Sequence, residues 1–250
     1  MPNLSQENFA LPSTFGFSGT NVKQLAQHGT ANKTLVTLVL DASGSVDPFW
    51  APMVKAVESV VKSLSLSPRA DSLVLRMVLF NQALREYHGF RPLAECHLAE
   101  YEVQKLGRAY GGTALFDVSY NAIESTTKYA RELSIQEDIE SNGIVIVITD
   151  GDDQNSSLTA NAVGKASKDA LQSEHLESLI SILVGVNVDN NLQTYLEKFK
   201  NDGGFTHFVA IDDVTDRKIA KLADFVSKSV SAQSASLGTG GPSQAIPLVI

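Results

Sequence analysis

Runs of apolar, mostly β-branched residues recur along the chain, and polar segments separate them. Four of these runs are long and largely apolar, which is typical of strands buried on both faces, as in a parallel sheet. The four runs are residues 34–40, 72–80, 144–149 and 179–186. Residues 85–90 are predicted to pair with the second run as an antiparallel edge strand, and residues 205–211 to form a sixth strand.

Between these strands, apolar residues recur every three to four positions, which is the period of an amphipathic helix. In residues 48–66 the apolar stripe consists of Phe49, Met53, Val57, Val60, Val61 and Leu64. Further helices are predicted at residues 115–133, 158–176, 191–200 and 215–233. Strands that alternate with helices predict a doubly wound, Rossmann-like α/β fold. Its six-stranded, mostly parallel sheet has one antiparallel edge strand and helices on both faces.

The regular pattern predicts one domain, over residues 33–235, although two small domains would also fit the length of 250 residues. Residues 1–32 are predicted to be an extension with little regular structure, whose phenylalanines dock onto the domain. Residues 236–250 are predicted to be a tail, with an apolar end that could dock at a place the sequence does not indicate.

Composition and charge exclude several classes of partner. The 43% of apolar and 19% of charged residues are those of a globular chain rather than a disordered one. The formal net charge of −8 argues against nucleic acid or an anionic membrane as a partner, since both need clustered Lys and Arg. No apolar run is long enough to span a membrane and no signal peptide is recognised, so we expect a cytoplasmic location. A single cysteine, Cys96, excludes a disulfide within the chain.

Candidate chemistry gathers where predicted strands end or a predicted helix begins. Asp-Ala-Ser-Gly-Ser at 41–45 follows the first strand, and Thr-Asp-Gly-Asp-Asp at 149–153 ends the strand that begins at residue 144. Gly-Gly-Thr at 111–113 precedes a helix. In open α/β sheets, ligands bind at the carboxyl ends of the strands. These segments offer carboxylates and hydroxyls without thiols or histidines, which favours Mg²⁺ before Mn²⁺ or Ca²⁺.

In this order, DASGS, GGTALFD and ITDGDD resemble the von Willebrand factor A (vWA) domain with an intact metal-ion-dependent adhesion site. The resemblance covers roughly residues 33–233. The five metal ligands that it implies are Asp41, Ser43, Ser45, Thr113 and Asp150. It implies direct coordination by the two serine hydroxyls, and by Thr113 when a partner is bound. The two aspartates would act mostly through water. Of the neighbouring acids, Asp117 is expected to favour a helix N-terminus, and Asp152 and Asp153 to be solvated.

The function that the resemblance implies is docking. An ion held directly by neutral hydroxyls keeps much of its charge, so a partner's Glu or Asp can complete its coordination. We therefore expect a non-enzymatic protein-binding module. A likeness to intracellular prokaryotic single-domain forms implies an AAA+ ATPase or a stress-response system as the partner.

Two alternatives remain open. One is a structural subunit that self-associates through its terminal extensions. The other, less favoured, is a metal-dependent hydrolase. Phosphatases that use a nucleophilic Asp need a second acid two residues later, whereas Asp41 is followed there by Ser43. No Gly-x₄-Gly-Lys-Ser/Thr phosphate-binding loop is present either.

Overall fold

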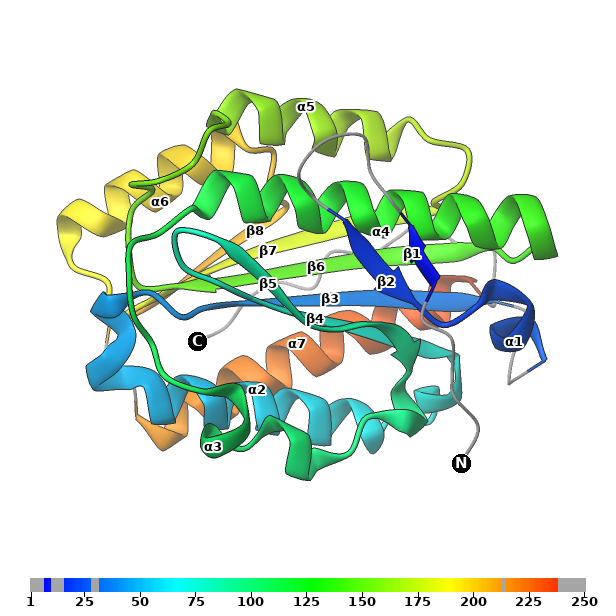
Figure 1. Ribbon diagram of the computed structural model, residues 1–250, viewed down its shortest axis with the longest axis horizontal. Helices are drawn as coiled ribbons and strands as arrows, with labels where there is room; N and C mark the ends of the chain where they lie inside the picture. Colours follow the sequence, from blue (N-terminus) through cyan, green and yellow to red (C-terminus); the bar gives the residue numbers. More distant parts are fainter. Residues whose placement is uncertain (1–6, 10–15, 28–31, 213–214, 238–250) are drawn as a thin grey trace.

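A central sheet divides the molecule into two helical layers, as the computed structural model shows for residues 7–9, 16–27, 32–212 and 215–237 (Figure 1). The strands are β1 (Glu7–Phe9), β2 (Phe17–Gly19), β3 (Lys33–Asp41), β4 (Leu73–Phe80), β5 (Leu84–Pro92), β6 (Ser141–Thr149), β7 (Ser178–Val186) and β8 (His207–Ile211). The α-helices are α1 (Val22–Ala26), α2 (Trp50–Ser65), α3 (Val103–Leu106), α4 (Leu115–Glu137), α5 (Ala160–Leu171), α6 (Asn190–Asp202) and α7 (Asp216–Leu237). Short 3₁₀ helices are η1 (Gly44–Phe49), η2 (Ala70–Ser72), η3 (Leu93–Glu95) and η4 (Leu98–Tyr101).

The strand order is β1-β2-β5-β4-β3-β6-β7-β8. Strand β3 lies in the middle and pairs in parallel with β4 and β6, while β7 and β8 continue the parallel arrangement. Strand β5 pairs antiparallel with β4, as predicted. The doubly wound α/β fold is therefore confirmed. Because the strands are parallel, β3 and β6 end at the same edge of the sheet, and the segments that follow them can meet there.

Two details of the predicted sheet are wrong. The described residues contain more strands than the predicted six, because β1 and β2 add to them. The antiparallel strand β5 is also not at the edge, since Gly19 of β2 pairs with Phe90 of β5. Both errors have one cause: a strand of three residues, Phe-Ser-Gly at 17–19, is too short to show an alternating pattern.

Residues 17–26, here called the N-terminal strap, are folded against the domain, so the expectation of little regular structure is wrong for them. Phe17, Val22 and Leu25 are buried. The Phe17 ring meets Tyr129 edge to face at 6.4 Å, and the Tyr129 hydroxyl donates a hydrogen bond of 2.7 Å to the Thr20 carbonyl. The predicted docking of the phenylalanines is thus confirmed for Phe17. Phe15 and residues 238–250, like the side chain of Phe9, lie outside the part of the chain that is described.

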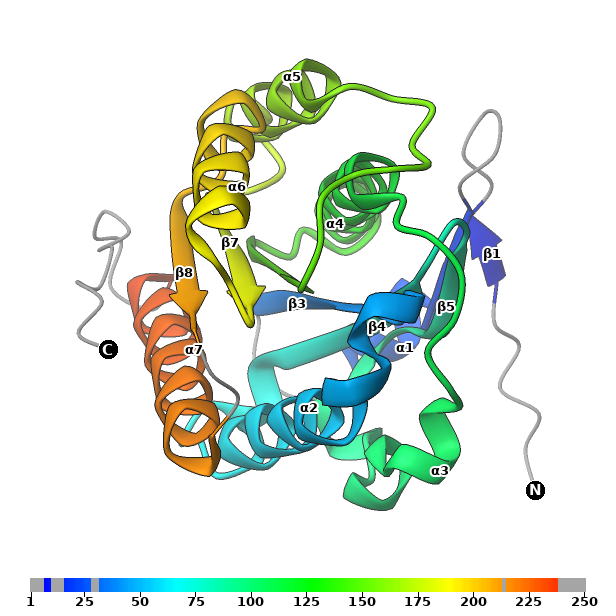
Figure 2. The same cartoon turned by 90° about the vertical axis from the view of Figure 1, so that its left-hand side faces the viewer.

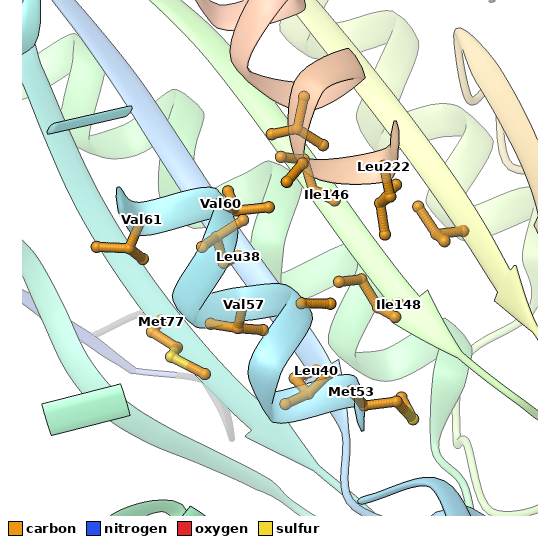
Figure 3. Close-up of a cluster of buried hydrophobic side chains, with 14 of the residues drawn as sticks. Leu38, Leu40, Met53, Val57, Val60, Val61, Met77, Ile146, Ile148 and Leu222 are labelled. Carbon is orange, nitrogen blue, oxygen red and sulfur yellow. The ribbon is translucent and has the colours of Figure 1, made fainter. Parts of the chain in front are cut away.

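Alternate residues of β3 face the two layers. Leu38 and Leu40 pack beneath α2 and α7, and Leu35 and Val39 face α4 on the opposite side. Figure 3 shows the first cluster, in which α2 contributes Met53 and Val57. Period-two alternation on a strand covered on both faces explains why the run is apolar throughout. No helix in the described ranges is long and apolar enough to cross a membrane.

The sheet encloses the charged side chain of Arg76. Arg76 of β4 is fully buried and its Nε lies 2.6 Å from Glu86 Oε1. Its other guanidinium nitrogens donate to Ser125 Oγ at 2.8 Å and Asn121 Oδ1 at 3.0 Å. Glu86 Oε2 accepts two hydrogen bonds from the N-terminal strap, from the Ser18 amide and hydroxyl. A buried charge is tolerated only when it is paired and hydrogen-bonded in this way. The network therefore links the strap to the interior of the domain.

Candidate metal site

The three polar segments meet at the carboxyl edge of the sheet. Figure 2 looks onto this edge, with η1 (blue) near the centre. The green segment from α3 to α4 and the light green segment after β6 lie on either side of it. Each of the five expected ligands is on one of these segments or at the end of β3, so the topology brings together residues more than 100 positions apart, such as Ser45 and Asp150.

Asp41 forms the floor of the site. Its side chain is fully buried, Oδ1 accepts a 2.8 Å hydrogen bond from the Ser43 amide, and Oδ2 accepts one of 2.6 Å from the Thr149 hydroxyl. Burial raises its pKa to about 6, against the opposing effect of these hydrogen bonds, and the nearby Asp150 raises it further. Thr149, which the ligand prediction did not include, therefore fixes the orientation of this carboxylate.

A chain of hydrogen bonds connects the two serines to the second carboxylate. Ser45 Oγ donates to Asp150 Oδ1 at 2.8 Å, and the Ser43 and Ser45 hydroxyls are 3.1 Å apart. Since the Ser45 proton goes to Asp150, Ser43 is the donor between the serines. Both lone pairs of the Ser43 oxygen and one lone pair of the Ser45 oxygen are then left to face a cation. Ser43 is buried, whereas Ser45 is exposed and Asp150 half-buried, so the site is accessible from one side.

Thr113 closes the site from the third segment. Its side chain is 2% exposed, and its amide donates to Asn155 Oδ1 at 3.0 Å. A methyl group added to Gly151 would lie 3.7 Å from Thr113 Oγ1 and 3.8 Å from Ser45 Oγ, which places both hydroxyls around one point. Among the described residues, Thr113 Oγ1 has no hydrogen-bond partner. This free hydroxyl is available as a ligand.

Backbone hydrogen bonds hold the first and third segments together. The Gly44 amide donates to the Gly111 carbonyl at 2.8 Å, and the Tyr110 amide donates to the Ala42 carbonyl at 2.8 Å. Gly111 has a φ of +84°, and a Cβ there would lie 1.8 Å from Gln82 Oε1. Only glycine meets both conditions. The positions of the hydroxyls thus depend on the geometry of this glycine-containing loop.

Asp117 lies in the first turn of α4, as expected, and both it and Asp153 form contacts that were not predicted. Asp117 is buried and accepts hydrogen bonds from the Ser157 amide and hydroxyl and from the Leu158 amide, at 2.8–3.1 Å. Asp153 accepts from the Phe116 amide at 3.1 Å, so it is not simply solvated. Both carboxylates fasten the segment after β6 to the start of α4. Asp152 is exposed, as predicted. No sequence pattern indicated these contacts, because they depend on how two distant loops pack.

The donor set fits a hard divalent cation. It offers two carboxylates and three hydroxyls, with space on the exposed side for further oxygen ligands. No Lys or Arg in the described ranges forms an ion pair with either carboxylate, and burial raises the pKa of Asp150 as well as that of Asp41. A cation between them would relieve this cost. No cluster of three or more His, Cys, Asp or Glu suited to a metal occurs in the described ranges, so any ion here depends on the hydroxyls.

An open α/β sheet with oxygen donors at its carboxyl edge defines a ligand-binding domain of the doubly wound class. The sequence matches the von Willebrand factor type A domain over residues 36–227, so the chain belongs to the vWA family. Members of this family are usually protein-interaction modules and commonly bind a divalent metal. A search of curated proteins finds no match.

Solved structures share the fold at low sequence identity. The pilus adhesin SpaC of Lactobacillus rhamnosus GG, in an open conformation, is 11% identical with a TM-score of 0.58, over 82% of this chain and 31% of the adhesin. The PilB minor pilin of Streptococcus sanguinis is 15% identical with a TM-score of 0.58, over 84% of this chain and 64% of the pilin. Manganese-loaded TRAP of Plasmodium vivax is 19% identical with a TM-score of 0.52, over 78% of this chain and 73% of TRAP. The chain thus spans about a third of the length of the adhesin. These likenesses establish the fold.

Proposed function

We propose that the chain is a non-enzymatic docking module in which Asp41, Ser43, Ser45, Thr113 and Asp150 hold Mg²⁺ and a partner protein supplies a Glu or Asp to it. The observation that carries the proposal is the hydrogen-bonded chain from Ser43 through Ser45 to Asp150, with the free Thr113 hydroxyl facing it. The bound ion would act as a Lewis acid for the partner's carboxylate. Mn²⁺ or Ca²⁺ could replace Mg²⁺, and the manganese-loaded TRAP protein supports a divalent ion in this fold.

The residues around the site favour docking over hydrolysis. Two acids on the surrounding segments, Asp117 and Asp153, are occupied by hydrogen bonds to backbone amides. Neither is free to activate a water molecule. Self-association through the N-terminal extension is also disfavoured, because Phe17, Val22 and Leu25 of the strap are buried in their own domain. The cytoplasmic location stays a prediction.

Metal binding is tested first, by titrating Mn²⁺ and following the free ion by electron paramagnetic resonance, with Mg²⁺ as competitor. Asp150→Asn should weaken binding, by about tenfold or more, since it removes a charged oxygen of the site. Asp152→Asn is the matched control: it makes the same change of charge two residues further along the same loop, at an exposed position. Equal affinity in the two variants would contradict the assigned ligand set.

Docking is tested by partner capture from the native source, in Mg²⁺ or in chelator. Ser43→Ala with Thr113→Val removes two proposed ligands without adding bulk, and urea unfolding of the variant checks that it is folded. A protein retained only by the wild type and only with Mg²⁺ supports docking, provided that replacing one of its own acidic residues abolishes retention. The captured set is examined for an AAA+ ATPase, the partner class that the resemblance implies. Retention of the same proteins in Mg²⁺ and in chelator, by the wild type and by the variant alike, would overturn the proposal.

A further inference from the structure

Beside the candidate metal site, the same edge of the sheet carries a hollow of about 110 Å³. Its lining includes Ala42, Leu84, Arg85, Arg108 and Tyr110, and we call it the arginine hollow. Ala42 lies between Asp41 and Ser43 in the sequence, so the hollow and the metal site adjoin at the end of β3. The rest of the lining comes from the tip of the β4–β5 hairpin and from the segment between α3 and α4, which lie next to one another in Figure 2.

The hollow is positively charged in an acidic chain. Arg85 Nη2 donates a 2.7 Å hydrogen bond to the Leu106 carbonyl, which fixes its guanidinium at the wall. Arg108 is exposed. It also borders a neighbouring hollow that contains Asp47, yet it forms no ion pair with that residue. Within the described ranges, no carboxylate pairs with Arg85 or Arg108, although the chain has a formal net charge of −8.

A carboxylate fits the arginine hollow better than an apolar or cationic group. A guanidinium presents several N–H donors in a fixed fork that matches the two oxygens of a carboxylate. The volume admits several water molecules, which an acidic side chain would displace. Tyr110, whose side chain is 65% exposed at the rim, offers a flat surface along which the chain carrying that acid can lie.

We propose that the arginine hollow binds a second carboxylate of the same partner segment that supplies the metal ligand. The inference rests on the proposed function and specifies its partner: an acidic peptide with two Asp or Glu side chains a few positions apart. Because an extended chain advances about 3.3 Å per residue and the two sites adjoin through Ala42, a spacing of one to three residues is expected. A basic or purely apolar segment would not be recognised.

The test selects binders from a displayed library of short random peptides, on the immobilised full-length chain in Mg²⁺ and, as background, in chelator. On the wild type, the enriched peptides should share two acids at a fixed spacing. On Arg108→Gln they should share one acid only. Arg131→Gln is the matched control: it removes one exposed positive charge near the far end of α4, and should select the same pair as the wild type.

Affinities of one selected peptide then assign each acid to its site. Replacing the acid assigned to the arginine hollow by its amide should weaken binding to the wild type by about tenfold. The same replacement should leave binding to Arg108→Gln unchanged. Replacing the acid assigned to the metal should abolish the dependence of peptide binding on Mg²⁺. The Mn²⁺ affinity of Arg108→Gln without peptide should equal or exceed that of the wild type, since a positive charge has been removed nearby.

Failure of this inference differs from failure of the proposed function. Mg²⁺-dependent peptides that share a single acid, and that bind Arg108→Gln as well as the wild type, would overturn the arginine hollow and leave metal-mediated docking standing. Enrichment that is the same with chelator as with Mg²⁺ would overturn the docking function and this inference with it.

Discussion

At the scale of the residue, the candidate site depends on side chains that do not themselves face the metal position. Asp117 is the clearest of them, because its two carboxylate oxygens accept three hydrogen bonds from Ser157 and Leu158. The segment that carries Asp150 is thereby fastened to the start of α4. Residues that orient the groups around a metal are commonly worth an order of magnitude in affinity.

Asp117→Ala should therefore weaken Mn²⁺ binding by about tenfold although no proposed ligand is removed. It should also lower the free energy of unfolding by about 1–3 kcal/mol, since amide donors of a partly buried loop lose their acceptor. Asp152→Ala, in the same loop but exposed, is the control for charge. Paramagnetic resonance titration and urea unfolding measure the two effects. An unchanged metal affinity in Asp117→Ala would show that the loop holds its shape without this carboxylate.

A buried histidine gives the fold a defined response to acid. His88 is 8% exposed and lies between the Tyr101 hydroxyl and the Gly89 carbonyl. Burial, with Arg91 adding to its effect, lowers the pKa of His88 to about 4, against the opposing effects of the Gly89 hydrogen bond and of Glu100. A pKa that is lower in the folded than in the unfolded state stabilises the protein above pH 6.5. That contribution is lost as the pH falls from 6.5 toward 4.

Between pH 7 and pH 4.5, wild type should lose about 2–3 kcal/mol more unfolding free energy than His88→Gln, which cannot titrate there. The comparison with the variant is needed because Asp41 acts in the opposite direction. Its pKa is raised to about 6, so protonation between pH 6 and 4 favours the folded state. Urea unfolding at both pH values makes the measurement. Parallel losses in the two proteins would mean that His88 is already charged in the fold.

At the scale of the element, the sequence predicted what is periodic and missed what depends on packing. The strands β3, β6 and β7 were predictable because alternate residues on both faces are apolar. Strand β2 was not, since three residues carry no period. The ligand segments were found because polar residues follow apolar strands directly. The roles of Thr149 and Asn155 could not be read from the sequence, because they depend on contacts between residues 108 and 42 positions apart.

Arg76 did leave a signal in the sequence, as a single charge within an apolar strand. A charge in a strand covered on both faces needs a buried partner, and Glu86 provides it. Glu86→Gln should lower the unfolding free energy by about 3 kcal/mol, because the guanidinium keeps its burial and loses its counter-charge.

Glu124→Gln is the control for this prediction. Glu124 pairs with Lys128 one helical turn away, at 3.6 Å and near the surface. Its loss should cost about 0.5 kcal/mol or less. Urea unfolding of both variants gives the comparison. Similar small losses would indicate that water reaches Arg76 in the folded protein.

At the scale of the whole molecule, the N-terminal strap belongs to the domain rather than to an interface between copies. Phe17 stands against Phe90 of β5 and Tyr129 of α4, so removing the strap uncovers two aromatic rings. In sedimentation, a chain that lacks residues 1–27 should show the same number of copies per particle as the full chain. It should unfold at clearly lower urea concentration, since burial of even one phenylalanine contributes about 3 kcal/mol. Fewer copies per particle without loss of stability would instead favour the assembly subunit.

The N-terminal strap contacts residues far along the sequence. These separations also set the order in which parts of the molecule can fold. Ser18 contacts Glu86 across 68 positions, and Thr20 contacts Tyr129 across 109. During synthesis, the strap leaves the ribosome before either partner has been made. Contacts between distant parts of the chain must wait for the intervening chain to be made, and they form slowly. The strap, which is translated before both of its partners, is therefore among the last segments to reach its final place, and until then the growing chain carries Phe17, Val22 and Leu25 uncovered.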